Sequence, residues 1–315
     1  MSYKNLIVNP SLFPSMVVVS VNNVCNYKCI HCYYPEYSKN PEYEKRYLSS
    51  EIFMKIAREI SMFSESTLRL IAWGEPLLHP EIETFINIMR SEAPRNKVTL
   101  ITNGSLLTAD RAMAIMEGGL DLIEISTDAF REESYAQKRC SNIHNAFDKL
   151  EKNITTMVAL RDKHEFNTKI VLSYILWPDG ESQKELESFC NKWRHIVDDI
   201  AIRPLHTFME SIEVPADGIT NDFDDRPPCY SLWGRCHINP WGEISVCYND
   251  WDRKNVLANY ESENVSIAAV WQSIAIKELR DGQVRGRFSG CCTNCKDFNP
   301  NAWDNPYENL IERLL

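Results

Sequence analysis

The first two thirds of the chain alternate short apolar runs with longer segments whose apolar residues recur every three or four positions. The short runs are rich in β-branched residues and predict strands at Met16–Val21, Thr67–Trp73, Lys97–Thr102, Asp121–Thr127, Lys169–Leu176 and Asp199–Pro204. The longer segments predict helices at Ser50–Met62, Pro80–Arg90, Thr108–Met116, Asn142–Arg161 and Ser182–Trp193. This alternation predicts a parallel sheet with right-handed crossovers, and six strands are too few for a closed eight-stranded barrel. We therefore expect an α/β fold, a partial (six-stranded) parallel β/α barrel.

The pattern changes in the last third of the chain. Residues 208–228 are acidic, rich in Asp and Pro, and lack either period, which predicts a linker. Beyond them we expect a hairpin within Asn239–Asp250, one helix over Ser266–Asp281, and a small cysteine-rich domain. The predicted division is a core at 1–207, a linker at 208–228 and a C-terminal domain at 229–315.

Composition and charge exclude several classes of protein. The chain has 315 residues, of which 44% are hydrophobic and 25% charged, enough for an ordinary folded core. Its net charge of −10 argues against a nucleic-acid or membrane partner. No run approaches the roughly 18 apolar residues of a spanning helix, and the N-terminus lacks the build of a signal peptide. We expect a cytoplasmic protein.

The eleven cysteines form two clusters and two isolated positions. Their density is below that of disulfide-rich secreted scaffolds, so metal ligands, catalytic groups or packed thiols are expected. Cys140 and Cys190 stand alone in helical segments, which predicts packed thiols. The clustered cysteines are at positions 25, 29 and 32, and at 229, 236, 247, 291, 292 and 295.

The N-terminal cluster follows the first predicted strand directly. Parallel α/β folds place their chemistry at the carboxyl ends of strands. Cys25, Cys29 and Cys32 can bind three corners of an iron–sulfur cube and leave its fourth iron without a protein ligand. The alternatives are a zinc knuckle completed by His31, or simply buried thiols.

The spacing Cys25-x3-Cys29-x2-Cys32 resembles the signature of the radical S-adenosylmethionine (radical SAM) superfamily. The resemblance implies that these cysteines bind a [4Fe-4S] cluster whose open iron takes SAM. Gly74-Glu75-Pro76 after the second strand is similar to the family's GGEP turn, with Trp73 in place of the first glycine. In the family this turn binds the amino group of the methionine moiety.

Four further residues resemble family segments around the cofactor. Asn103 after the third strand, and Ser126 and Asp128 at the end of the fourth, correspond to segments near the adenosyl and methionine portions. Arg139 occupies a place where relatives put an arginine against the cofactor carboxylate, a task suited to guanidinium. Strand-end caps and a solvated surface arginine are the alternative interpretations.

The C-terminal cysteines resemble the SPASM domain or its shorter twitch form. Twelve residues separate Cys229 from Gly242, four separate Gly242 from Cys247, and Cys292-x2-Cys295 follows. Trp233, Trp271 and Arg280 also stand where that domain carries such residues. Because no cysteine follows, the resemblance implies one auxiliary [4Fe-4S] cluster bound by Cys229, Cys247, Cys292 and Cys295. Cys291 can substitute for Cys292, and a structural zinc site remains an alternative.

The resemblance also implies an activity. Such enzymes take an electron from a donor such as flavodoxin or ferredoxin, cleave SAM reductively to a 5′-deoxyadenosyl radical, and abstract hydrogen from a substrate C–H bond. The compact tail is similar to enzymes that oxidise or epimerise sugars and cyclitols, so we expect a carbohydrate-like small molecule. Cys236 is the candidate hydrogen donor for epimerisation, with a core thiol as the alternative.

Other functions remain open from the sequence. A maturase acting on a ribosomally made peptide is the second expectation, weakened because only about 15 residues precede the first strand. An RNA-modifying enzyme would need a basic stripe. A non-catalytic iron–sulfur relay or a zinc-stapled binding protein would need no SAM pocket. Candidates to face the substrate are Tyr174, Trp177, Arg203 and His206.

Overall fold

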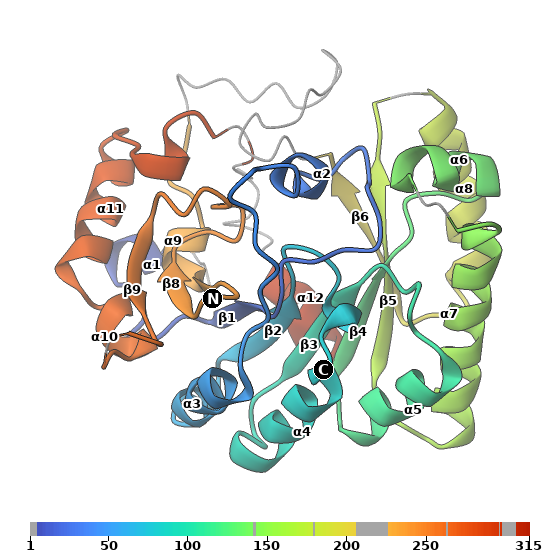
Figure 1. Cartoon of the computed structure of the whole chain (residues 1–315), viewed down its shortest axis with the longest axis horizontal. Helices are drawn as coiled ribbons and strands as arrows, with labels where there is room; N and C mark the ends of the chain where they lie inside the picture. The colour runs from blue at the N-terminus through green and yellow to red at the C-terminus, as the bar shows by residue number, and fades with distance from the viewer. Residues whose placement is uncertain are drawn as a thin grey trace.

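The computed structural model describes residues 5–140, 143–178, 180–205, 226–262, 264–295, 297 and 307–315. These residues form a sheet with the order β6-β5-β4-β3-β2-β1-β7-β8-β9 (Figure 1). Its strands are β1 (Met16–Ser20), β2 (Thr67–Ile71), β3 (Val98–Thr102), β4 (Leu122–Ser126), β5 (Lys169–Leu176), β6 (Asp199–Pro204), β7 (Arg235–Ile238), β8 (Glu243–Ser245) and β9 (Val256–Asn259). Strands β1 to β6 are parallel, β7 is parallel to β1, and β8 and β9 continue antiparallel.

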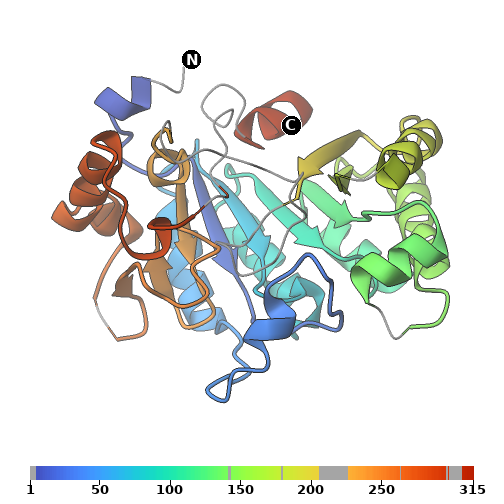
Figure 2. The same ribbon diagram turned by 90° about the horizontal axis from the view of Figure 1, so that it is seen from above.

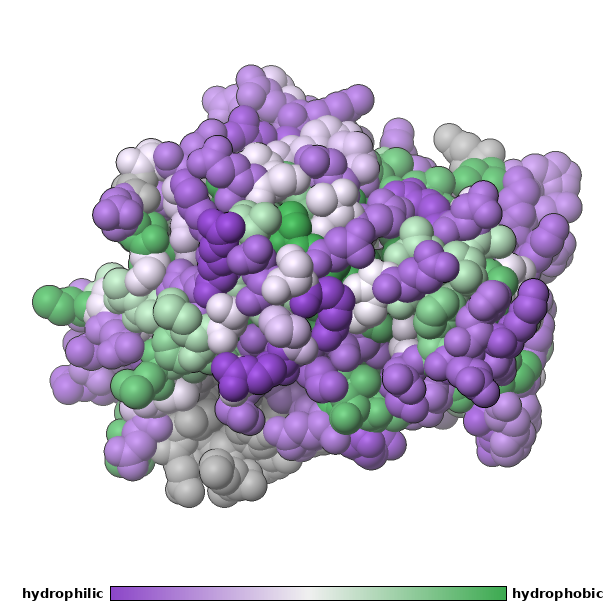
Figure 3. Space-filling model, turned by 90° about the horizontal axis from the view of Figure 1, so that it is seen from below, coloured by the Kyte–Doolittle hydropathy of each residue, from purple (hydrophilic) through white to green (hydrophobic). Residues whose placement is uncertain are grey.

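Helices lie between the parallel strands and before and after them in the described chain. They are α1 (Asn5–Val8), α2 (Tyr34–Tyr37), α3 (Ser50–Ile60), α4 (Ile82–Glu92), α5 (Ala109–Glu117), α6 (Glu132–Arg139), α7 (Ala146–Lys163), α8 (Gly180–Trp193), α9 (Ser231–Gly234), α10 (Ile267–Trp271), α11 (Ile274–Val284) and α12 (Tyr307–Leu314), with 3-10 turns η1 (Pro76–Leu78) and η2 (Gly290–Cys292). In the described part of the chain, no helix has the length and apolar character needed to cross a membrane. The face seen from below is largely hydrophilic, with scattered apolar residues (Figure 3).

The predicted α/β fold with a partial parallel barrel is confirmed. All six predicted strands are present, with bounds that differ from the predictions by at most two residues at either end. In the cysteine-rich C-terminal region, β7 pairs with β1 and so extends the same sheet. The helix predicted over Ser266–Asp281 is two helices, since Ser273 accepts a hydrogen bond from the amide of Ile276 and starts α11. Of the predicted linker, residues 208–225 lie outside the described residues.

Alternate residues of the strands serve two cores. On one face Val17 and Val19 of β1 join the main core under the helices that follow each strand. On the other face Met16 and Val18 pack with Ile311 of α12. Helix α12 therefore lies across the sheet from α3 and α4 (Figure 2).

A buried charged cluster also fixes α12. Glu124 of β4 is paired with Arg69 of β2 at 2.9 Å and with Arg203 of β6 at 2.6 Å. Despite burial, these guanidinium groups lower the pKa of Glu124 to about 2. The ring of Tyr307 lies 3.8 Å from the Arg69 guanidinium. The cluster thus joins three strands to the C-terminal helix.

Glu59 connects α3 to the C-terminal region. Its carboxylate accepts hydrogen bonds from the amides of Ile267 and Ala268 at 2.9 and 2.8 Å, and from the Tyr260 hydroxyl. A carboxylate at the first turn of α10 satisfies amides that the helix leaves unpaired. One buried side chain thus fastens the cysteine-rich region to the barrel.

We predict that Glu59→Ala lowers the free energy of unfolding by about 3 kcal/mol, because three buried donors lose their acceptor. Glu51→Ala, at an exposed position of the same helix, is the matched control, with an expected change within about 0.5 kcal/mol. Urea unfolding followed by circular dichroism measures both. Equal stabilities of the two variants would contradict the role of Glu59.

Candidate active site

The N-terminal cysteines lie in the loop that follows β1, at the carboxyl ends of the parallel strands. The amide of Tyr27 donates to Cys25 Sγ and the amide of Tyr34 donates to Cys32 Sγ, both at 3.4 Å. Cys29 Sγ accepts from Arg139 Nη1 at 3.7 Å. Hydrogen bonds to sulfur stabilise the thiolate form and tune iron–sulfur clusters. The donor set around these three sulfurs therefore fits a cluster.

Burial raises the pKa of all three thiols, that of Cys32 to about 12. Without a metal they are protonated at neutral pH. Iron binding requires thiolates and releases those protons.

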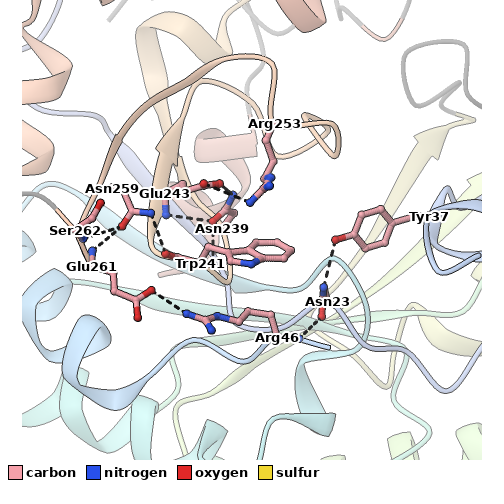
Figure 4. Close-up of polar contacts among 10 residues, drawn as sticks. All are labelled: Asn23, Tyr37, Arg46, Asn239, Trp241, Glu243, Arg253, Asn259, Glu261 and Ser262. Carbon is pink, nitrogen blue, oxygen red and sulfur yellow. Dashed lines mark hydrogen bonds and ion pairs between the residues drawn. The ribbon is translucent and has the colours of Figure 1, made fainter. Parts of the chain in front are cut away.

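The chain after the triplet folds back onto the end of β1. Asn23 donates to Tyr37 Oη at 3.2 Å and accepts from the amide of Arg46 at 2.7 Å (Figure 4). Arg46 also pairs with Glu261 at 2.8 Å, which ties this segment to the loop after β9. These bonds close the chain around the cysteine loop.

The Gly74-Glu75-Pro76 turn abuts the cysteine loop. A Cβ atom on Gly74 would lie 1.9 Å from the carbonyl oxygen of Val24, so only glycine fits. The Glu75 amide donates to that same carbonyl at 2.7 Å. The buried Glu75 carboxylate accepts from Thr102 Oγ1 and from the amide of Asn103, at 2.5 and 2.7 Å. Its side chain thus holds the turn against the end of β3.

Asn103 links the same two regions. Its Nδ2 donates to Asn26 Oδ1 at 3.0 Å, directly beside Cys25. Its own Oδ1 accepts from Ser105. Asn103 is therefore at once a turn residue and a support for the cysteine loop.

Asp128 and Arg139 form a buried ion pair behind Cys29. Asp128 follows β4 with a left-handed φ of 60°, and it also accepts from the amide of Ile175 at 2.9 Å. Arg139 and the hydrogen bond from His31 Nε2, at 3.3 Å, keep the pKa of Asp128 well below its usual range despite burial. Arg139 is 6% exposed, so the alternative of a solvated arginine is wrong. Ser126 ends β4, half-buried beside Ser173.

Among the residues that the structure describes, three buried polar atoms near Cys29 lack partners. They are Nδ1 of His31, Nε of Arg139 and Nε1 of Trp177. The rings of His31 and Trp177 meet edge to face with centroids 6.0 Å apart. Orphaned donors and acceptors beside an open metal position fit a polar ligand. From the sequence, His31 is a candidate only as a zinc ligand; its position between two cysteines is the signal for a role at this site.

The other candidates to face the substrate are placed differently. Tyr174 is fully buried against Phe189 on the helix-covered side of the sheet, so that expectation is wrong. Arg203 is occupied by Glu124. His206 lies outside the described residues.

The two isolated thiols, Cys140 and Cys190, lie in different environments. Cys140 is exposed, with a left-handed φ of 43° at the end of α6, so the prediction of a packed thiol is wrong there. Cys190 is half-buried against the main core.

The C-terminal cysteines converge around η2. Burial and then the neighbouring Cys247 and Cys292 raise the pKa of Cys229 to about 11. Burial and then Cys247 raise the pKa of Cys295 as well. The neighbouring Cys247 and Cys292 raise the pKa of the Cys291 thiol, so the structure brings both candidates for that ligand to the site. Within the described ranges no group of three or more His, Cys, Asp or Glu has the arrangement of ligands to a single metal ion.

Neighbouring polar groups hold these cysteines in place. The amide of Asn249 donates to Cys247 Sγ at 3.4 Å, and Arg226 Nη1 donates to the carbonyl of Cys292 at 2.7 Å. The amide of Cys229 donates to Gln283 Oε1 at 2.7 Å. The thiol-rich donor set fits an iron–sulfur cluster.

Cys236 is paired in register with Val17 and belongs to the main core. Burial and then Glu59 raise the pKa of its thiol. Its neighbour His237 has the opposite orientation and contacts Ser20 and Trp73. The position matches the alternative of a core thiol and gives no support to a hydrogen donor.

Two family models match this chain. The model of the radical SAM superfamily matches residues 19–192, more than half of the chain, and that of an iron–sulfur cluster-binding domain (SPASM) matches residues 229–296. The chain belongs to the radical SAM superfamily. Membership implies SAM, a [4Fe-4S] cluster that binds it and an auxiliary cluster.

Individual relatives have low sequence identity to this chain. The GTP 3′,8-cyclase of Limosilactobacillus fermentum is 30% identical over 176 residues, which cover 56% of this chain and 49% of that protein. The cyclase of Lactiplantibacillus plantarum is 27% identical over 66% of this chain and 60% of that protein. The chain spans about half the length of these curated relatives.

Solved structures share the fold at low identity. BtrN in complex with AdoMet and 2-DOIA has a TM-score of 0.61 and 17% identity, covering 91% of this chain and 94% of that chain. Streptococcus suis SuiB bound to precursor peptide SuiA has a TM-score of 0.67 and 12% identity, covering 88% and 69%.

We predict that Gly74→Ala lowers the rate of SAM cleavage at least about a hundredfold, because the turn must move away from Val24. Gly180→Ala is the control, since its added Cβ meets nothing within 4 Å. Formation of 5′-deoxyadenosine by the reconstituted proteins measures both rates. Full activity of the Gly74 variant would refute the close approach of the turn.

Proposed function

We propose that this radical SAM enzyme oxidises (dehydrogenates) or epimerises a sugar- or cyclitol-like small molecule. The observation that carries the proposal is the convergence of a second cysteine set around η2. A cluster with all ligands from protein is suited to exchanging electrons with a substrate radical. In this proposal residues 1–207 generate the radical and residues 229–315 hold the auxiliary cluster.

The site divides into two ligand sets. Cys25, Cys29 and Cys32 would hold the cluster that binds SAM. Cys229, Cys247, Cys295 and either Cys291 or Cys292 would hold the auxiliary cluster. Together, the SAM-binding cluster and SAM supply a 5′-deoxyadenosyl radical.

The remaining residues orient the ligands and exclude water. Glu75 and Asn103 fix the turn and the cysteine loop against β3. Asp128 orients Arg139 toward the sulfur of Cys29. His31 and Trp177 offer unpaired polar atoms to SAM or substrate. The fold brings these groups from separate loops to one place, where they can orient SAM and substrate.

One likeness supports a small substrate. The match with BtrN extends over nearly the whole of both chains, and BtrN is described with the small molecule 2-DOIA. The likeness to SuiB, described with a precursor peptide, makes a peptide maturase the second candidate. The alignment with the cyclase relatives covers about half of their length. These relatives therefore support radical generation only. The eleven free cysteines favour a reducing compartment such as the cytoplasm, where flavodoxin or ferredoxin can supply electrons.

We predict about eight irons per chain after anaerobic reconstitution, and about four in a variant with Cys25, Cys29 and Cys32 all changed to Ala. Cys190→Ala, which alters neither ligand set, should keep about eight irons. Iron and acid-labile sulfide assays measure these ratios. About four irons in the parent, with zinc at the C-terminal cysteines, would rule out the auxiliary iron–sulfur cluster.

We predict that the double variant Cys229→Ala/Cys247→Ala still cleaves SAM but loses product formation at least about tenfold. Candidate sugars and cyclitols are assayed by mass spectrometry in D2O. Loss of two hydrogens from the product identifies oxidation, and gain of one deuterium at carbon identifies epimerisation.

Cys140→Ala, at an exposed site, is the control and should match the parent. An unchanged product yield from the double variant would exclude a role for the auxiliary cluster in turnover. Turnover of a precursor peptide but of no sugar or cyclitol would favour the second candidate.

A further inference from the structure

A pocket of about 370 Å³ lies between α1, α10 and α11. Its lining includes Trp271, Lys277 and Arg280, together with the apolar side chains of Ile7, Leu12 and Val284. None of its lining residues belongs to the cysteine triplet or the Gly74-Glu75-Pro76 turn. The surrounding helices α10 and α11 lie at the left edge of the molecule in Figure 1.

Arg280 distinguishes this pocket. Its side chain is 6% exposed, its Nε donates to the carbonyl of Leu232 at 2.8 Å, and its guanidinium lies 4.4 Å from the centre of the Trp271 ring. Within the described part of the chain, its Nη2 is buried without a hydrogen-bond partner. Burial lowers the pKa of Arg280 to about 10, so it remains charged at neutral pH.

Two other arginines of the fold have a carboxylate partner. The buried Arg139 is paired with Asp128, and the half-buried Arg235 is paired with Glu308 at 3.0 Å. Among the described residues Arg280 has no such ion pair. Because a buried charge without a counter-ion is costly, an anion in the pocket would compensate it.

The remaining charges specify which anion fits. Lys277 and Asp281 also line the pocket, so with Arg280 its net charge is +1. A monoanion neutralises this charge, whereas a doubly charged phosphate exceeds it. The volume is at the small end of ligand pockets.

We propose that this pocket binds a small monocarboxylic acid, with its carboxylate on Arg280 and its apolar part against Ile7, Leu12 and Val284. The site is separate from the proposed active site, and its test does not depend on turnover. Because Trp233 of α9 also lines the pocket, a bound acid would contact the turn that follows Cys229.

Titration calorimetry of the reconstituted holoenzyme with sodium hexanoate tests the proposal, with hexanamide as the neutral analogue. Hexanoate is expected to bind with a dissociation constant in the millimolar range, and hexanamide at least about tenfold more weakly. Lys277→Glu should weaken hexanoate binding several-fold, and Asp281→Asn should strengthen it. Arg285→Gln, an exposed arginine at the end of α11, is the control and should leave binding unchanged.

Arg280→Gln should abolish hexanoate binding, provided that its iron content and circular dichroism match the parent. The two surface variants keep the test decisive if Arg280→Gln fails to fold. Equal binding of hexanoate and hexanamide, no binding of hexanoate up to 50 mM, or no response to either surface variant would overturn the proposal. Binding of inorganic phosphate in preference to hexanoate would overturn it as well.

Discussion

The pairing of β1 on both of its edges is the constraint on which the rest of the structure depends. All five residues of this strand are buried, and it forms parallel ladders with β2 and with β7. If the register of β1 slipped by one residue, Val17 and Val19 would leave the main core, and Met16 and Val18 would take their places. The loop carrying the cysteine triplet therefore begins from a position fixed by both halves of the chain.

Buried charges then define how the elements sit around that strand. Glu59 joins α3 to α10, Glu124 joins β4 to β2 and β6, and Asp128 joins the end of β4 to α6. The partners of Glu59 and Glu124 come from elements far apart in the sequence, whereas Asp128 and Arg139 lie on consecutive elements. Removing one partner leaves a buried charge without compensation. Such contacts therefore destabilise alternative packings of the helices and strands more strongly than apolar contacts do.

The local features were predictable from the sequence and the non-local ones were not. The strands follow from short β-branched runs, and the cysteine loops follow from spacing alone. The pairing of β7 with β1 joins residues more than 200 positions apart, and no periodicity reports it. The expectation that Tyr174 faces the substrate is wrong because successive residues of a strand face opposite sides of the sheet, and the sequence alone does not show which side Tyr174 faces. The Asp128–Arg139 pair depends on a left-handed residue that no pattern marks.

The hydrogen bonds to the cysteine sulfurs include both local and non-local contacts. Cys25, Cys32 and Cys247 each accept from the amide two residues later, a contact that the loop makes within itself. Cys29 instead accepts from a guanidinium on α6, which Asp128 orients. Donors to sulfur favour the thiolate and shift the reduction potential of a cluster. Two of the three triplet sulfurs therefore have donors set by local sequence, whereas the donor to Cys29 exists only because the whole sheet brings α6 to the cysteine loop.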